Sequence, residues 1–279
     1  MAPRCRAVAA LVASVRMHPI ERLRWIARDR DEAPTALAVE AAWAISELAL
    51  DEPLAVVTAC RRLVESHVSF GPLWWVAATV LVASDPHQAA RRAAGELASD
   101  PTADLLAAGL SERLLGDAPV VVVCPAQTVL EACSRRESAV VRVVGSSPGL
   151  RAEVRRFAAV SAASGWELDE AEEVFRGAAV VLVEALAAGS RGVLVSALAS
   201  RLAQAAHDAA VPLWGVVGAG RVLHDQLLGE LMRRAGDALE LMEPGALDLV
   251  VGPSGLAGPV QALRQGACPP APELVVRAG

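Results

Sequence analysis

The chain has 279 residues, a formal net charge of -6 and a hydrophobic fraction of 54%, and it contains neither Lys nor Asn. This length suits one large domain or two smaller ones with a buried core, and the missing residue types exclude a Schiff-base lysine, a phosphate-loop lysine and an N-glycosylation acceptor. The acidic balance and the lack of any Lys/Arg run argue against direct binding to nucleic acid.

The N-terminal part has the periodicity of amphipathic helices. From Ile20 to about Leu115, apolar residues recur at i, i+3, i+4 and i+7 in segments such as "TALAVEAAWAISELAL" and "PLAVVTACRRLVESH". Capping or turn residues interrupt this pattern at 31–34, 51–53, 69–72 and 85–86. We therefore predict a helical domain over residues 1–115.

After Gly116 the pattern changes to short β-rich runs that alternate with helices. The runs "PVVVVC", "AVVRVVG", "AAVVLVEAL", "VPLWGVVG" and "LDLVVG" are nearly continuous in apolar residues. Such runs are typical of parallel strands that helices cover on both faces. We therefore predict an α/β fold over residues 116–279, a Rossmann-like doubly wound parallel-sheet domain with ligands at the carboxyl ends of its strands.

The cysteines and glycines point to no metal or cofactor. The five cysteines are odd in number and lack CxxC spacing, so we expect no disulfide framework and no metal site, and a reducing cytoplasm is the simplest location. Gly218-Ala-Gly220 follows a late strand, but Leu223 stands where a dinucleotide fingerprint has its third glycine, so we expect no NAD. The longest apolar run near the middle of the first half of the chain, "GPLWWVAATVLVAS", is shorter than the ~20 residues of a membrane span.

Several segments resemble, in the same order, those of the translation initiation factor 2B alpha/beta/delta family. The run "LELMEPGALDLVVGPSGLAGP" resembles its closing segment, and "DEAPTALAVEAAWA", "SHVSFGPLWWVA", "CPAQTVLEAC" and "VVLVEALAAGSRGVLVSALASRLAQAAHDAAVPLWGVV" resemble earlier ones. That family includes methylthioribose-1-phosphate isomerase and ribose-1,5-bisphosphate isomerase. The resemblance spans roughly Ile20 to Pro259 and implies a helical domain, a Rossmann-like domain and a homodimer.

The family's isomerases use a cysteine and an aspartate as acid/base partners. Cys124 follows the first predicted strand, as the family's cysteine does, although Pro125 replaces the polar residue that usually comes next; the other interpretation is a packed, inert thiol. Ala185, or Leu186 if one gap is allowed, stands at the aspartate. Neighbouring Glu184 is either a replacement base or a capping or solvent-facing residue, since strand alternation points it to the opposite face.

The positions that hold phosphate in these isomerases are also changed. Asp31-Glu32-Ala33-Pro34 stands where the family has Arg-Gly-Ala-Pro, and its charge would repel an anionic substrate. His67, Ser69, Arg191 and Arg221 remain as candidate ligand-binding residues. For His67 and the two arginines the alternative is an ordinary solvated charge on a loop.

We therefore expect an initiation factor 2B-like pseudoenzyme, a non-catalytic binding or regulatory protein that has lost the isomerase residues. We expect it to be a cytoplasmic homodimer without membrane attachment, with a small phosphorylated metabolite as ligand. The alternative is an aldose-ketose sugar-1-phosphate isomerase-like enzyme whose active site is rebuilt around Cys124. The geometry and chemistry of the site, and not the fold, distinguish the binding protein from the enzyme.

Overall fold

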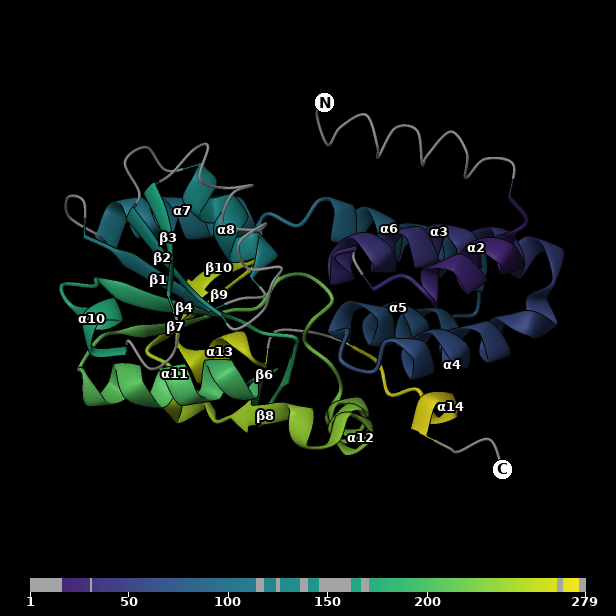
Figure 1. Cartoon of the computed structure of the whole chain (residues 1–279). Helices are drawn as coiled ribbons and strands as arrows, with labels where there is room; N and C mark the ends of the chain where they lie inside the picture. Colours follow the sequence, from purple (N-terminus) through teal and green to yellow (C-terminus); the bar gives the residue numbers. More distant parts are fainter. Residues whose placement is uncertain are drawn as a thin grey trace. The chain divides into compact units, whose positions relative to one another are not determined.

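The computed structural model describes residues 17–30, 32–113, 118–123, 126–135, 140–145, 162–166, 171–264 and 268–275. The chain divides into two compact units, Met1–Ala98 with Pro269–Gly279, and Ser99–Cys268. The first unit is helical, and the second contains a mostly parallel sheet with helices (Figure 1). The predicted fold class is therefore confirmed.

The helices of the helical unit begin where proline or a capping residue permits. They are α2 (Pro19–Ile26), α3 (Pro34–Asp51), α4 (Val56–Ser66), α5 (Gly71–Leu81), α6 (Pro86–Ala98) and α14 (Pro272–Val275), with a short 3-10 helix, η1 (Pro53–Ala55). Proline lies in the first turn of α2, α3 and α5, where a helix makes no use of the missing N–H. The first turn of α6 is capped by the Asp85 carboxylate, which accepts a hydrogen bond from the backbone N–H of Gln88 at 3.0 Å.

Small side chains and one buried arginine hold the helical unit together. Helices α3 and α6 pack against each other, and both bury several alanines: Ala38, Ala41, Ala42, Ala89, Ala90, Ala93 and Ala94. Alanines at a contact allow two helix axes to approach closely. Arg22 of α2 is buried and donates to the carboxylates of Glu40 at 3.1 Å and Glu47 at 2.9 Å, which ties α2 to α3. None of the helices described is both long and apolar enough to span a bilayer.

Within the described residues of the α/β unit, seven strands form one sheet in the order β10-β9-β7-β4-β1-β2-β3. The strands are β1 (Val120–Val123), β2 (Val140–Val144), β3 (Ala162–Trp166), β4 (Val180–Glu184), β7 (Leu213–Val216), β9 (Leu249–Gly252) and β10 (Gly255–Ala257). Neighbours are parallel except for β10 and β9. From β1 the chain builds outward to β2 and β3 and then returns to place β4 on the other side of β1. The strand order therefore reverses between β1 and β4.

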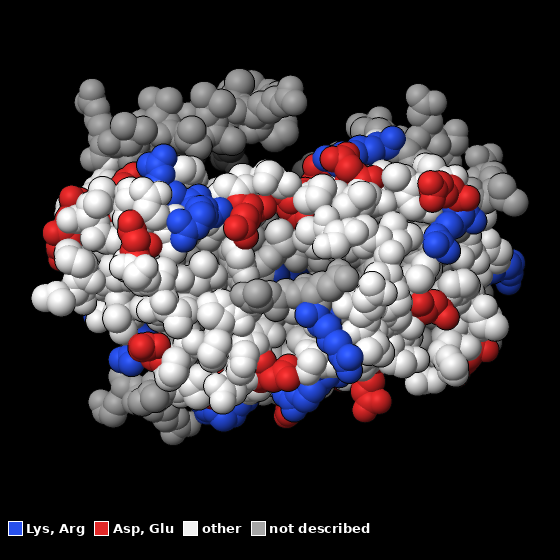
Figure 2. All heavy atoms as spheres, turned by 180° about the vertical axis from the view of Figure 1, so that it is seen from behind, with Lys and Arg blue, Asp and Glu red and all other residues white. Residues whose placement is uncertain are grey.

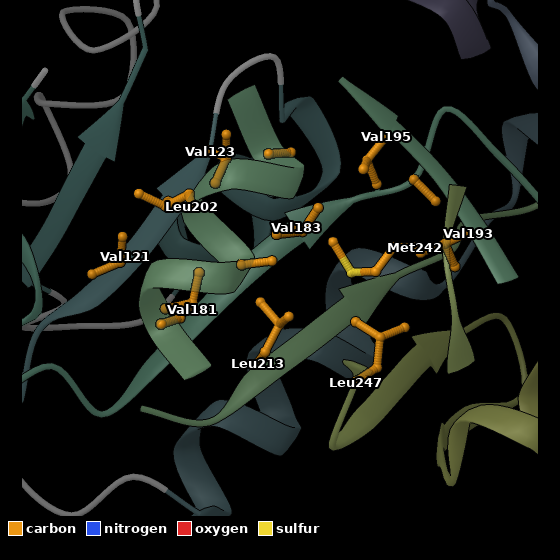
Figure 3. Packing of buried hydrophobic residues seen from close by; sticks show 14 of the residues in the cluster. Val121, Val123, Val181, Val183, Val193, Val195, Leu202, Leu213, Met242 and Leu247 are labelled. Carbon is orange, nitrogen blue, oxygen red and sulfur yellow. The ribbon is translucent and has the colours of Figure 1, made fainter. Parts of the chain in front are cut away.

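Helices cover both faces of this sheet, as the continuous Val/Leu runs predict (Figure 1). On one face, strand residues pack around α11 (Ala197–Asp208), and the labelled side chains of Figure 3 include Val121, Val123, Val181, Val183, Leu202 and Leu213. On the other face, the alternate strand residues pack against α7 (Thr102–Arg113) and α8 (Gln127–Ser134): Val120, Val122, Val180, Leu182, Trp214 and Val216. The two-residue repeat of the strands thus divides the core into two layers.

The division between the two compact units falls between residues 98 and 99. Helix α7 packs against α8, β9 and β10, so it belongs to the α/β unit, while α14 returns to pack on α4. Helix α7 approaches β10 closely at Gly109, where a Cβ would lie 2.8 Å from the Leu256 side chain, so a larger residue there would clash with Leu256.

A second, antiparallel sheet flanks the first in the α/β unit. It consists of β5 (Ala187–Gly189), β6 (Gly192–Ser196) and β8 (Leu239–Met242) in that order. Val193, Val195 and Met242 extend the core layer around α11 (Figure 3). The remaining elements described are α10 (Ala171–Phe175), α12 (Asp225–Ala235), η3 (Gly236–Ala238), η4 (Pro244–Ala246) and α13 (Pro259–Ala262).

Candidate functional site

The carboxyl ends of β1 and β4 form the point where the strand order reverses, which is where doubly wound sheets bind ligands. We call this edge, together with the end of the adjacent β7, the switch point. The three strands end at Val123, Glu184 and Val216. Glu184 is the only ionisable residue among these three strands, so it is the natural starting point for the site.

The Glu184 side chain lies on the α8 face and caps that helix. Its Oε2 accepts hydrogen bonds from the backbone N–H of Thr128 at 2.8 Å and of Val129 at 3.3 Å, and its Oε1 accepts one from the Thr128 hydroxyl at 3.0 Å. The residue before the helix, Ala126, provides no side-chain cap. A carboxylate from β4 therefore satisfies N–H groups that the first turn leaves free, at the positive end of the helix dipole. Of the interpretations open for Glu184, the structure shows the capping one, and the side chain is not solvent-facing.

Arg221, which follows β7, is buried against the same carboxylate. Its Nη2 donates to Oε1 of Glu184 at 2.6 Å, and its Nη1 donates to the carbonyl of Ala185. The side chains of Arg221 and Glu184 are only 4% and 5% exposed. Buried charges are tolerated only when they are paired and hydrogen-bonded, as both are here. The sequence predicts a cation for a ligand at Arg221, whereas in the structure these two Nη atoms bind groups of the chain itself.

The glycine loop before Arg221 is held by a second carboxylate. Oδ2 of Asp100 accepts a hydrogen bond from the N–H of Ala219 at 2.8 Å, while its Oδ1 accepts one from the N–H of Thr102 at 3.0 Å. A Cβ on Gly218 would lie 2.7 Å from Oδ2 of Asp100, and Gly220 has a φ of 71°. The close approach at Gly218 and the left-handed backbone at Gly220 each favour glycine, so turn geometry accounts for the Gly-x-Gly run.

The residues aligned with the family's aspartate are apolar and structural. Ala185 has no exposed surface and packs in the core layer around α11. Leu186 is half-buried, and its N–H donates to the carbonyl of Leu194 in β6 at 2.8 Å. Neither side chain can exchange a proton with a ligand.

His67 lies in the helical unit, between α4 and α5, and is buried. Its Nε2 donates to the carbonyl of Ile26 at 2.7 Å, and its ring stacks on Phe70 with the ring centroids 4.9 Å apart. Burial is the main cause that lowers the pKa of His67 from its usual 6.5, and the nearby Arg30 lowers it further, against the opposing effects of the Ile26 hydrogen bond and of Asp29. His67 is therefore a neutral, helix-packing side chain at pH 7.

The other candidate residues are distributed over both units. Ser69 is half-buried on the same connection as His67. Arg191 is exposed in the turn between β5 and β6, where the neighbouring Ser190 donates from its N–H at 3.1 Å and its hydroxyl at 2.6 Å to Asp225. Those two hydrogen bonds are the main reason that the pKa of Asp225 is lowered, and Arg191 contributes to the shift. Cys124 lies outside the described residues.

The described cysteines are buried. Cys60, Cys133 and Cys268 form no disulfide, and their side chains lie below the surface. Burial raises the pKa of Cys60 to about 12 and that of Cys268 to about 11, so both are protonated at neutral pH. Among the described residues, no cluster of three His, Cys, Asp or Glu side chains is arranged to hold a metal ion.

The sequence reasoning missed Thr128 and Asp100, and it did not pair Glu184 with Arg221. A signal for the pair was present, because opposite charges at the ends of two neighbouring strands are expected to meet. The strand order was needed to use it, since β4 and β7 are neighbours with Glu184 beside Val216. Basic and acidic side chains are interspersed on the face seen in Figure 2, where the described residues form no continuous basic surface for a phosphate backbone.

Comparison with solved structures identifies the fold. The chain superposes on translation initiation factor eIF-2B of Pyrococcus horikoshii OT3 with a TM-score of 0.70 and 20% identity, covering 88% of this chain and 98% of that one. For the tetrameric eIF2B-beta2-delta2 complex of C. thermophilum the values are 0.65 and 17%, over 87% and 91%. For 5-methylthioribose 1-phosphate isomerase of P. horikoshii OT3 they are 0.60 and 14%, over 88% and 85%.

Comparison with protein-family models finds no match, and neither does comparison with curated protein sequences. The structural similarity extends over both units, and at these identities it establishes the fold and leaves the activity to be argued from the site. The chain therefore has the fold shared by the subunits of translation initiation factor 2B and by 5-methylthioribose 1-phosphate isomerase, as the order of its sequence segments predicted.

Proposed function

We propose that this protein is a non-catalytic binding or regulatory protein with the initiation factor 2B-like fold, and that it does not isomerise sugar phosphates. One observation carries the proposal: Glu184 and Arg221, the ionisable side chains that the structure describes at the switch point, are buried against each other. Because one neighbour in fold is a 5-methylthioribose 1-phosphate isomerase, aldose-ketose isomerisation is the reaction to exclude.

Moving a proton between adjacent carbons requires a base within hydrogen-bond reach of the substrate. The Glu184 carboxylate already accepts hydrogen bonds from two backbone N–H groups, a hydroxyl and a guanidinium, and its side chain is 5% exposed. These contacts hold it against α8. Ala185 and Leu186 have no titratable group. The described part of the switch point thus supports a site that lacks a general base.

Holding a phosphate requires cations or N–H donors that face the ligand. At the switch point, the guanidinium of Arg221 and the N–H groups of the first turn of α8 face Glu184 instead. In the segment 31–34, Glu32 is exposed and brings a negative charge, while Asp31 lies outside the described residues. Both features oppose a sugar phosphate bound as in an isomerase.

The proposal is tested by incubating the purified protein with ribose 1,5-bisphosphate and with methylthioribose 1-phosphate and measuring the ketose product over time. We expect no conversion above that in buffer. Conversion by the wild-type protein would overturn the proposal. If Cys124→Ser then abolished it and Cys133→Ser did not, the activity would belong to the alternative, an enzyme rebuilt around Cys124. Cys133 is the matched control because it is a buried thiol on α8.

We extend the proposal to assembly and ligand: a cytoplasmic homodimer that binds a small phosphorylated metabolite. The C. thermophilum neighbour is a tetrameric complex, which supports assembly of this fold into oligomers. Arg191 is exposed and is the first candidate for a cation that binds the phosphate of this ligand. Size-exclusion chromatography with light scattering tests the dimer, and a monomer at every concentration would contradict it. A thermal-shift panel of sugar phosphates, repeated with Arg191→Gln, tests the ligand.

A further inference from the structure

The carboxylate of Glu184 is surrounded as a bound anion is. It accepts hydrogen bonds from the backbone N–H groups of Thr128 at 2.8 Å and Val129 at 3.3 Å. It also accepts hydrogen bonds from the Thr128 hydroxyl at 3.0 Å and the Arg221 guanidinium at 2.6 Å. These donors come from the first turn of α8 and from the loop after β7, two segments that are far apart in the sequence. Backbone N–H groups, a hydroxyl and an arginine together are the donor set that proteins use to recognise carboxylates and phosphates.

The donors are held in place by contacts that do not involve Glu184. Nη1 of Arg221 donates to the carbonyl of Ala185, which orients the guanidinium. The loop before it is fixed by the hydrogen bond from the N–H of Ala219 to Asp100 at 2.8 Å. On the other side, the Thr128 and Val129 N–H groups belong to α8, whose buried face packs against the sheet. The site is therefore organised before an anion enters it, which reduces the ordering cost of binding.

We infer that this constellation is an anion site at the switch point that the protein occupies with its own Glu184 carboxylate. The internal carboxylate keeps free anions out, and the group that fits in its place is a small carboxylate such as formate. This inference goes beyond the proposed function, because it holds whether or not the protein turns over any substrate.

Shortening the side chain at residue 184 tests the inference. Glu184→Ala removes the carboxylate and leaves space beside Arg221 and Thr128, whereas Glu184→Gln loses the same charge but keeps the space filled. Thermal unfolding of the full chain is measured with increasing formate and, at equal ionic strength, with chloride. We expect a saturable rise in the melting temperature with formate over chloride for Glu184→Ala, and none for the wild type or for Glu184→Gln.

Two results would overturn the inference: no formate-specific rise for Glu184→Ala, or an equal rise for all three proteins. If Glu184→Ala is unfolded in buffer, its refolding is followed by far-UV circular dichroism in formate and in chloride, and failure of formate to restore the helical signal refutes the inference as well. In the double variant Glu184→Ala/Arg221→Met, the formate effect should be lost, and its persistence would exclude Arg221 from the site. The isomerase assay is independent of these measurements, so the two proposals can fail separately.

Discussion

Replacing Arg221 by Met tests the ion pair on which the site is built. The side chains of Arg221 and Glu184 are 4% and 5% exposed, so the variant leaves a carboxylate buried without its cation. Removing one partner of a buried pair costs about 3–5 kcal/mol of unfolding free energy. Met keeps much of the volume of the arginine stem, so the cost reflects the unpaired charge and the lost hydrogen bond to the Ala185 carbonyl more than a cavity.

The double variant Glu184→Met/Arg221→Met distinguishes two contributions of Glu184 to stability, its ion pair with Arg221 and its capping of α8. With both charges removed, no unpaired charge remains, and apolar replacement of a buried pair is often neutral. The first turn of α8 still loses the carboxylate that caps Thr128 and Val129, which costs about 1 kcal/mol. We therefore expect the double variant to be more stable than Arg221→Met by about 2–4 kcal/mol.

Urea denaturation followed by far-UV circular dichroism and by tryptophan fluorescence measures these differences, because Trp214 in β7 lies in the same unit as the pair. The matched control is Arg176→Ala, which breaks an exposed pair with Glu173 whose atoms are 3.7 Å apart, and it should leave the midpoint close to that of the wild type. If the unfolding free energy of Arg221→Met lay within about 1 kcal/mol of the wild-type value, the reasoning would be refuted, since a buried carboxylate without its cation should destabilise the protein by more than that.

Two further predictions concern the helical unit and the thiols. Because burial raises the pKa of Cys60 to about 12 and that of Cys268 to about 11, both should react with Ellman's reagent at neutral pH only after unfolding; peptide mapping that finds Cys60 labelled in the folded protein would contradict this. Since the pKa of His67 is lowered on folding, mainly by burial, the stability that the neutral imidazole contributes is present above its usual 6.5 and is lost as the pH falls below that value. The difference in unfolding midpoint between the wild type and His67→Gln should therefore shrink below about pH 6.5, and a constant difference would disprove the assignment.

The fold could be predicted in large part because its strands are continuous apolar runs. The Val-rich runs include β1 (Val120–Val123) and β4 (Val180–Glu184), since strands covered on both faces can bury every residue. The unit to which a helix belongs is not given by its local pattern. Helix α7 has the same helical pattern as the helices before it, and its packing on β9 and β10 places it in the other unit. A local pattern predicts that a helix forms and leaves open which surface it covers.

The candidate site shows a similar division. Strand alternation places Glu184 on the face opposite to Ala185, and the structure agrees. What alternation does not reveal is that this face carries the first turn of α8 with free N–H groups. For Arg221 the sequence left two interpretations, a ligand-binding cation or a solvated charge on a loop, and in the structure two Nη donors of its guanidinium bind the chain. For His67 the sequence likewise left a ligand-binding residue or a solvated charge, and the structure shows its ring hydrogen-bonded to the Ile26 carbonyl at the end of α2. Each outcome depends on a partner that is distant in the sequence.

The sequence by itself determined the order of the elements, the buried character of the sheet and the absence of lysine chemistry, because these depend on residue type and on local periodicity. The resemblance of its segments to the initiation factor 2B family predicted the architecture that the structure then showed. Only the tertiary structure decided that Glu184 and Arg221, which are 37 residues apart, neutralise each other at the switch point. The physical reason is that a buried charge is stable only with its counter-charge and hydrogen bonds in place, and those partners are brought together by the strand order and by no local signal.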